Sequence, residues 1–266
     1  MTPVEVTQGP GPIVLGLPHT GTWLPDRIAA RLNARGRMLA DTDWHVDRLY
    51  AGLLPGLTIV RATFHRYGID ANRPPGGDSL YPGQNTTGLV PLTDFDGAPI
   101  WADPPDASEV VARCQGFHAP YHAALAAELE RVRAIHGLAI LYDCHSIRSR
   151  IPYLFPGTLP DFNIGTADGT SCDPRIAGAV QGICAGAEGY THIVNGRFKG
   201  GWTTRHYGRP DRGIHAIQME LAQSTHLETE APPFALSVDK AARLRPILAR
   251  ILSTLADLAP DLRSPA

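Results

Sequence analysis

The chain lacks long hydrophobic runs, an excess of one charge and a recognisable export signal. It has 266 residues, of which 43% are hydrophobic, and none of its apolar stretches approaches the roughly 20 residues that cross a bilayer. The N-terminus, MTPVEVTQGPGP, has no basic segment followed by an apolar one. With 24 basic and 26 acidic residues, the composition gives no electrostatic footprint for nucleic acid or an anionic membrane. We therefore expect a cytoplasmic protein that binds a small molecule, with no nucleic-acid or membrane partner.

Cysteine is scarce as well. Cys114, Cys144, Cys172 and Cys184 show no CxxC spacing, so the sequence indicates neither a disulfide framework nor a thiolate zinc site. We expect these side chains to be small, buried and reduced.

Short apolar runs alternate with helical stretches along the chain. An alanine-rich segment predicts a helix over about 117–136, ended by Gly137. The alternation predicts a single α/β domain over residues 1–266, with a mixed, mostly parallel sheet flanked by helices. The Pro-rich C-terminus from about residue 258 is expected to fray. The strand candidates are residues 13–17, 57–64, 138–142 and 215–221.

Two stretches rich in Gly, Pro, Asn and Asp interrupt this pattern, at residues 71–106 and 195–208. Both carry too many aromatic and apolar residues to indicate disorder. Long ordered loops inside a compact domain are usually functional, so we expect both to contribute to a binding site.

Two histidines follow predicted strands. His19 lies in PHTG after the run 13–17, and His145 lies in DCHS after the run 138–142. Ligands commonly bind at the carboxyl edge of an α/β sheet. Two imidazoles there could hold a divalent metal, with a carboxylate as the third protein ligand and water in the open position. The competing interpretation is that each histidine is a hydrogen-bonded turn residue.

Carboxylates for such a site are present. The segment DTDWHVDRLY contains Asp41, Asp43 and Asp47 at an expected helix start, where Asp43 and Asp47 share one face and either could be a ligand. Helix capping and a solvated surface are the alternative. Glu220 lies inside the apolar strand candidate HAIQMEL, where burial would raise its pKa and suit it as a general base.

Arginines in or beside the Gly-rich loops indicate an acidic substrate, because Arg can bind a carboxylate through two parallel hydrogen bonds. For each one alone, a surface ion pair is the competing interpretation. His65, Arg66 and His206 could line the site or simply pack. The arginines are Arg73, Arg148, Arg197 and Arg205.

Several longer strings go beyond these general patterns. PHTG, DTDWHVDRLY, HRYGIDANRPPGG, SLYPGQNTTGLVPLTDFDG, DCHSIRSRIPYLFPG, NGRFKGGWTTRHYG and HAIQMELAQ occur in order from about residue 10 to about residue 250. Together they resemble the N-formylglutamate amidohydrolase family. The resemblance implies a phosphorylase/hydrolase-like α/β fold related to zinc carboxypeptidases. It also implies hydrolysis of N-formyl-L-glutamate to formate and L-glutamate, the last step of a histidine degradation route.

Matched by motif, the resemblance assigns roles to individual residues. It implies that His19 and His145 are metal ligands, with zinc the first candidate, and that Asp43, in preference to Asp47, is the third. Glu220 would be the general base. Substrate-binding roles would fall to Asn72 and Arg73, with Arg66, Arg205 and His206 as further contacts.

One departure concerns the metal ligands. Zinc carboxypeptidases take a histidine and a carboxylate ligand from one compact HxxE segment, whereas PHTG has no acid within three residues of His19. The residues alone leave two other functions open. One is hydrolysis of a different N-acyl amino acid, and the other is non-catalytic binding of an acidic metabolite.

Overall fold

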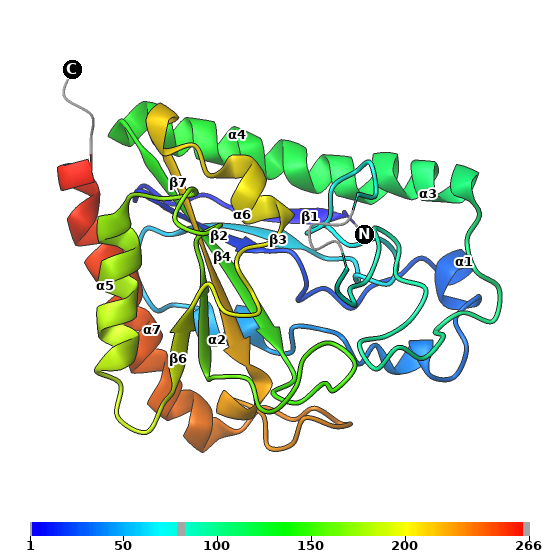
Figure 1. Cartoon of the computed structure of the whole chain (residues 1–266). Coiled ribbons are helices and arrows are strands. Elements are labelled where there is room, and N and C mark those ends of the chain that lie inside the picture. Colours follow the sequence, from blue (N-terminus) through cyan, green and yellow to red (C-terminus); the bar gives the residue numbers. More distant parts are fainter. Residues whose placement is uncertain (1, 79–82, 263–266) are drawn as a thin grey trace.

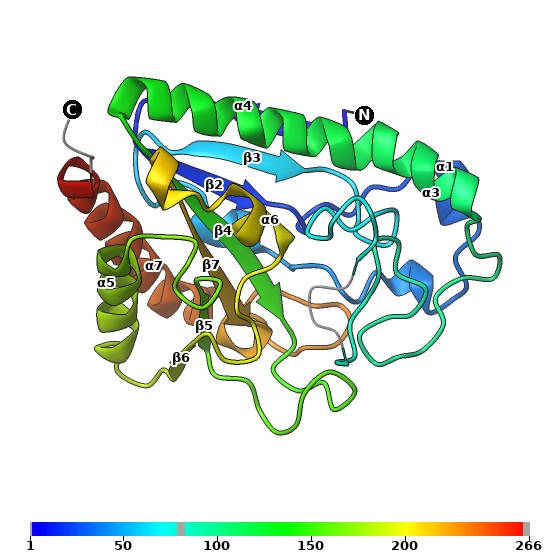
Figure 2. The same ribbon diagram turned by 45° about the horizontal axis from the view of Figure 1, so that its top comes forward.

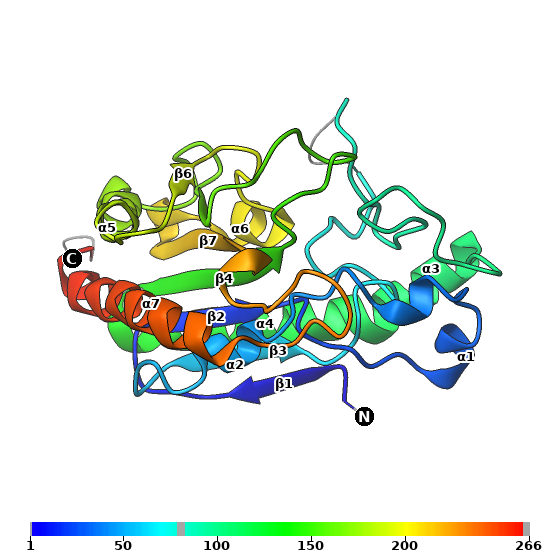
Figure 3. The same ribbon diagram turned by 90° about the horizontal axis from the view of Figure 1, so that it is seen from below.

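Seven strands form one mixed sheet in the order β1-β3-β2-β4-β7-β5-β6. The computed structural model describes residues 2–78 and 83–262. The four central strands, β3, β2, β4 and β7, are mutually parallel, and β1 and β5 are antiparallel to their inner neighbours. Figure 3 shows β1 at one edge of the sheet and β6 toward the other. The strands are β1 (Val4–Thr7), β2 (Ile13–Leu17), β3 (Thr58–Ala62), β4 (Ala139–Ile147), β5 (Phe162–Gly165), β6 (His192–Val194) and β7 (Ile214–Ala222).

Helices cover both faces of the sheet, which confirms the predicted α/β class. Helices α4 and α6 lie on one face, and α2, α5 and α7 lie on the other (Figures 1 and 2). None of the described helices is long and apolar enough to span a membrane. The longer helices are α3 (Ala107–Arg113), α4 (Ala119–His136), α5 (Pro174–Ala185), α6 (Trp202–Tyr207) and α7 (Val238–Leu258). The short ones are α1 (Asp26–Ala29), η1 (Gly36–Met38), α2 (Val46–Tyr50), η2 (Cys114–His118), η3 (Pro210–Arg212), η4 (Gln223–Thr225) and η5 (Ala259–Leu262).

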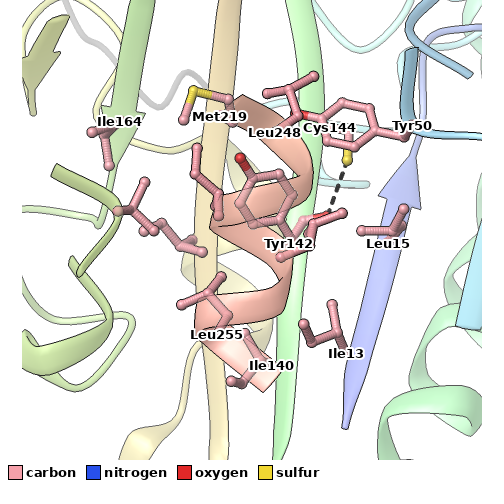
Figure 4. Close-up of a cluster of buried hydrophobic side chains, with 14 of the residues drawn as sticks. Ile13, Leu15, Tyr50, Ile140, Tyr142, Cys144, Ile164, Met219, Leu248 and Leu255 are labelled. Atoms are coloured by element: carbon pink, nitrogen blue, oxygen red, sulfur yellow. Dashed lines mark hydrogen bonds between the residues drawn. The ribbon is translucent and has the colours of Figure 1, made fainter. Parts of the chain in front are cut away.

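The central strands are apolar because they are buried on both faces. In β4, Ile140, Tyr142 and Cys144 point toward α7 in the larger core cluster, shown in Figure 4. Leu141 points the other way, toward α4. Side chains alternate between the two faces of a strand, so Asp143 and His145 continue the α4 face. The same alternation puts Gln218 and Glu220 on that face of β7, with Glu220 beside His145 in the register.

Several expected boundaries were wrong. His145 lies within β4, because this strand runs further than the predicted 138–142. Glu220 lies within β7, as the strand candidate 215–221 predicted. The predicted helix 117–136 is preceded by α3 and the π-helical turn η2 without a break, so the helical run starts at Ala107. At the C-terminus, residues 259–262 do not fray, because they form η5 and bury Ala259 and Leu262.

The segment between β3 and α3 contains no helix or strand over its described residues, 63–78 and 83–106, as predicted for a long loop. It lies beyond the carboxyl ends of β2, β3 and β4 (Figures 1 and 2). It buries Leu89, Ile100 and Trp101 against the α4-side core. By contrast, 195–208 is only partly a loop, since it contains α6. The N–H groups at the start of α6 bond to Gln218 and Asn72, which are distant in sequence.

The turn after β2 is held tightly against the end of β3. The N–H of Trp23 donates to Thr63, and the N–H of His65 donates to Trp23. A Cβ atom on Gly21 would lie within 2.6 Å of backbone atoms of Thr63 and Phe64. Only glycine therefore fits at this point of the His19 turn.

We predict that Gly21→Ala lowers the free energy of unfolding by about 1–3 kcal/mol, because the new methyl group overpacks against backbone that cannot move away. Gly178→Ala in α5 is the matched control, since its Cβ would meet nothing within 4 Å. That variant should raise stability by up to about 1 kcal/mol through helix propensity. Urea unfolding measures both, and equal stability of the two variants would contradict the steric argument.

Candidate metal centre and substrate pocket

Three buried side chains from separate elements meet at the carboxyl edge of the sheet. His19 Nδ1 lies 3.2 Å from His145 Nδ1, and Asp43 Oδ2 lies 3.2 Å from His145 Nδ1 and 3.6 Å from His19 Nδ1. Asp43 precedes α2 instead of starting it, and its N–H donates to the His19 carbonyl. His145 and His19 outweigh the effect of burial and lower the pKa of Asp43. The carboxyl group is therefore ionised beside two imidazoles.

A second carboxylate lies behind each histidine. His19 Nε2 contacts Asp70 Oδ1 at 2.7 Å, and His145 Nε2 contacts Asp143 Oδ2 at 3.1 Å. Arg66 donates to His19 Nδ1. Because a guanidinium cannot accept a hydrogen bond, Nδ1 must be the unprotonated nitrogen, and Nε2 donates to Asp70. This tautomer directs the lone pair of His19 toward Asp43 and His145.

These residues fit a divalent metal. The candidate donor atoms of His19, Asp43 and His145 all lie within 4.8 Å of one another, and two imidazoles with one carboxylate are a known ligand set of hydrolytic zinc sites. Carboxylates that hold the far nitrogen of ligating histidines are the usual supporting partners. The donor set does not identify the metal, since several divalent ions accept it.

Glu220 lies next to this cluster on the neighbouring strand. It is 7% exposed and pairs with His145 in the β4–β7 register. Gln218 Nε2 donates to Glu220 Oε2 at 3.1 Å, while Gln218 Oε1 accepts from the Gly201 N–H. Burial raises the pKa of Glu220 to about 8, with Asp43 adding to this effect and His145 opposing it. The carboxyl group can thus hold or release a proton near neutrality.

Asn72 connects the cluster to the loops. Its side-chain Nδ2 lies 3.2 Å from His145 Nε2, its Oδ1 accepts from the Thr203 N–H, and its own N–H donates to Asp70. A Cβ atom at position 201 would collide with the Asn72 side chain, so Gly201 permits this approach. Asn72 is thereby fixed between His145 and Asp70 on one side and the start of α6 on the other.

His19, His145 and Glu220 line one pocket together with three arginines. Arg66 is buried over the Phe95 ring, 5.0 Å from its centroid. Arg73 donates through Nε to the Thr87 carbonyl, and Arg197 does so to the Leu154 carbonyl. These two hydrogen bonds and the contact of Arg66 with Phe95 hold the three guanidinium groups around the pocket. The lining residues include His19, Arg66, Asn72, Arg73, Asn85, Thr86, Thr87, Phe95, His145, Arg197, Phe198, Gln218 and Glu220.

Other expected site residues lie elsewhere. Arg205 and His206 do not line this pocket. Arg205 Nε donates to Gly200 O, and His206 stacks on Trp202 beside a separate surface pocket. Asp47 is partly exposed and faces Arg61.

Three more candidates support the surroundings of the site. His65 contacts Thr42 Oγ1, and Asp41 accepts from the Phe95 N–H. Arg148 pairs with Asp96. None of the three lines the pocket.

Comparison with known proteins agrees with this arrangement. The profile of N-formylglutamate amidohydrolase matches residues 11–227. N-formylglutamate deformylases of Pseudomonas aeruginosa and Pseudomonas putida are each 46% identical to this chain, over 93% of it and over 94% and 93% of their own lengths. The chain belongs to the N-formylglutamate amidohydrolase family. A crystal structure of N-formylglutamate amidohydrolase from Ralstonia eutropha JMP134 superposes with a TM-score of 0.82 at 28% identity, covering 98% of this chain and 99% of that one.

Sequence reasoning missed the residues that hold the amidohydrolase site together. Gln218 could have been found, because it lies two positions before Glu220 on a predicted strand and therefore on the same face. Asp143 lies two positions before His145, but the predicted strand ended at residue 142. Asp70 lies two positions before Asn72 in an irregular segment, where no periodicity points to His19. Phe95 and Thr87 carried no signal.

We predict that Asp43→Asn weakens zinc binding by about 100-fold or more, because the site loses its one anionic donor. Asp47→Asn, four residues along but facing Arg61, should bind zinc as the wild type does. Isothermal titration with zinc chloride and the metal content after dialysis measure the effect. Unchanged zinc affinity in Asp43→Asn, with circular dichroism confirming the fold, would exclude Asp43 as a ligand.

Proposed function

We propose that this protein is a metal-dependent hydrolase that cleaves N-formyl-L-glutamate to formate and L-glutamate. One observation supports it above the others: the two histidines of the His19–Asp43–His145 cluster line the same arginine-walled pocket as the buried Glu220. The relatives at 46% identity are N-formylglutamate deformylases. The reaction would end a histidine degradation route, as the family resemblance implies.

The metal would be held by His19, Asp43 and His145. When bound, a zinc ion supplies Lewis acidity and lowers the pKa of water. Glu220 accepts the proton of the attacking water, whose oxygen bonds to the formyl carbon. Glu220 then delivers that proton to the departing glutamate nitrogen as the carbon–nitrogen bond breaks. Gln218 keeps the carboxyl group of Glu220 oriented during both transfers.

Arg66 stabilises the negative charge that develops on the formyl oxygen. Its guanidinium lies beside His19 Nδ1 and over Phe95; a metal on Nδ1 would replace its hydrogen bond to His19, which leaves this N–H to donate to the tetrahedral oxyanion. Donors fixed in advance in a site with little water stabilise such a charge strongly.

The substrate has two carboxylates, and the pocket wall offers Arg73 and Arg197. Arg73, with Asn72, holds one carboxylate close to the reacting end. Arg197, fixed by Leu154 and Asn85, meets the other. An N-acyl amino acid with an uncharged side chain has one carboxylate, so it would leave either Arg73 or Arg197 without an anionic partner.

Formate release from N-formyl-L-glutamate, assayed with and without added zinc, tests the activity itself. We predict that Glu220→Gln lowers kcat by about 10²–10⁴-fold, because the amide cannot accept the proton. Glu130→Gln is the matched control, because Glu130 is exposed and pairs only with Arg133 in α4. Near-normal turnover by Glu220→Gln would remove it as the base, and full activity after complete chelation would remove the metal.

The substrate's second carboxylate has its own test. We predict that wild type favours N-formyl-L-glutamate over N-formyl-L-glutamine, and that Arg197→Gln shrinks this preference about tenfold, mainly through KM, since a carboxylate–guanidinium pair is lost. Arg205→Gln, outside the pocket, should keep the preference. An equal loss on both substrates would show that Arg197 does not recognise the side-chain carboxylate.

A further inference from the structure

Three aromatic side chains beside the pocket form a cluster that the reaction itself does not use. His118, at the end of the π-helical turn η2, lies 4.4 Å from His122 between ring centroids. Trp202, the first residue of α6, packs against both rings, at 5.4 Å and 4.5 Å. The cluster joins α4 to α6 directly behind the segment 71–73.

Both histidines are directed at the backbone on either side of Asn72. His122 Nε2 donates to the Ala71 carbonyl at 2.8 Å, and His118 Nε2 donates to the Arg73 carbonyl at 2.9 Å. Carbonyl oxygens only accept, so each imidazole must carry its hydrogen on Nε2. The Tyr207 hydroxyl lies 3.0 Å from His122 Nδ1 and donates to the His122 carbonyl.

The clamped segment has no regular secondary structure to hold it. Even so, it carries Asn72, which touches His145, and Arg73, which lines the pocket. Burial lowers the pKa of His122 to about 3, so the ring stays neutral and carries its one hydrogen on Nε2, facing the Ala71 carbonyl. Two fixed donors, His118 at the end of η2 and His122 on α4, thus substitute for the ladder bonds that a strand would supply.

We propose that His118 and His122 are positioning residues that hold Asn72 and Arg73 in the geometry for binding a substrate carboxylate. This inference rests on the proposed function, specifically on the carboxylate role of Arg73. The histidines themselves touch neither the substrate nor the three candidate metal ligands.

The test is a double-mutant cycle between His118 and Arg73, with formate release from N-formyl-L-glutamate as the readout. His118→Leu removes the donor at similar size and should raise KM about tenfold with a smaller change in kcat, the size of one lost hydrogen bond. His118→Gln keeps an N–H donor and should recover most of that loss. In an Arg73→Ala background, His118→Leu should have almost no further effect, because the group it positions is gone.

A histidine at the other end of the same helix provides the control. His136 Nε2 donates to the Pro10 carbonyl at 2.7 Å, far along α4 from the pocket. His136→Leu should leave KM and kcat unchanged. If His118→Leu does not fold by circular dichroism, His118→Asn, whose side chain is too short to reach the Arg73 carbonyl, takes its place in the cycle.

The outcomes separate the two claims. Failure of the wild type to release formate, or an unchanged KM in Arg73→Ala, would overturn the proposed function and the positioning role with it. A raised KM in Arg73→Ala with no effect of the His118 substitution would overturn the positioning role alone. Multiplicative losses in the double variant would do the same, since they indicate a general structural effect. Near-zero additional loss supports the inference.

Discussion

The structure depends on keeping acidic side chains buried where the sheet meets its loops. Asp43, Asp70 and Asp143 are each at most 2% exposed, and all three lie against His19 or His145. A buried charge is stable only when it is paired and hydrogen-bonded, and removing one partner typically costs about 3–5 kcal/mol. A divalent cation would neutralise part of this negative charge, so metal binding and the stability of this region are coupled.

The sheet supplies the part of the site that must be rigid. His145 and Glu220 lie beside each other in adjacent parallel strands that are covered on both faces. Their separation is therefore set by strand spacing and not by a loop. Asp143 and Gln218, one step back on the same face, support them in the same register. The roles that we propose for them, metal ligand and proton acceptor, would need this precision, because small misplacements slow catalysis strongly.

The part of the site that lies on the sheet could largely be predicted from the sequence, for a physical reason. Apolar runs with a period of two give strands, and a carboxylate inside such a run, like Glu220, is conspicuous because burial is costly for it. The part of the site that lies on loops and on α6 was predicted poorly. Asp70 and Phe95 lie in a segment without periodicity, and their positions follow from tertiary contacts alone. α6 was missed because its first N–H groups are capped by Asn72 and Gln218, which no local pattern reveals. Arg205 and His206 were expected in the pocket because they adjoin a Gly-rich motif, but on a short helix neighbours in sequence point in different directions.

Some residues of the site lie on strands and others on loops, and this difference affects substrate specificity. His145 and Glu220, for which we propose the roles of metal ligand and proton acceptor, are held by strands, whereas Arg73, Thr87 and Phe95 belong to the segment between β3 and α3, and Arg197 to the segment after β6. Irregular segments tolerate substitution better than a doubly covered sheet. A change of substrate is therefore physically easiest through these loop residues, with the metal cluster and Glu220 unchanged. Asn72 is the exception, because it belongs to the loop but contacts His145, Asp70 and α6 at once. Any loop variant that moves Asn72 would therefore also disturb its contacts with His145 and Asp70. The hydrogen bonds of this one residue thus limit which loop substitutions the pocket can accept.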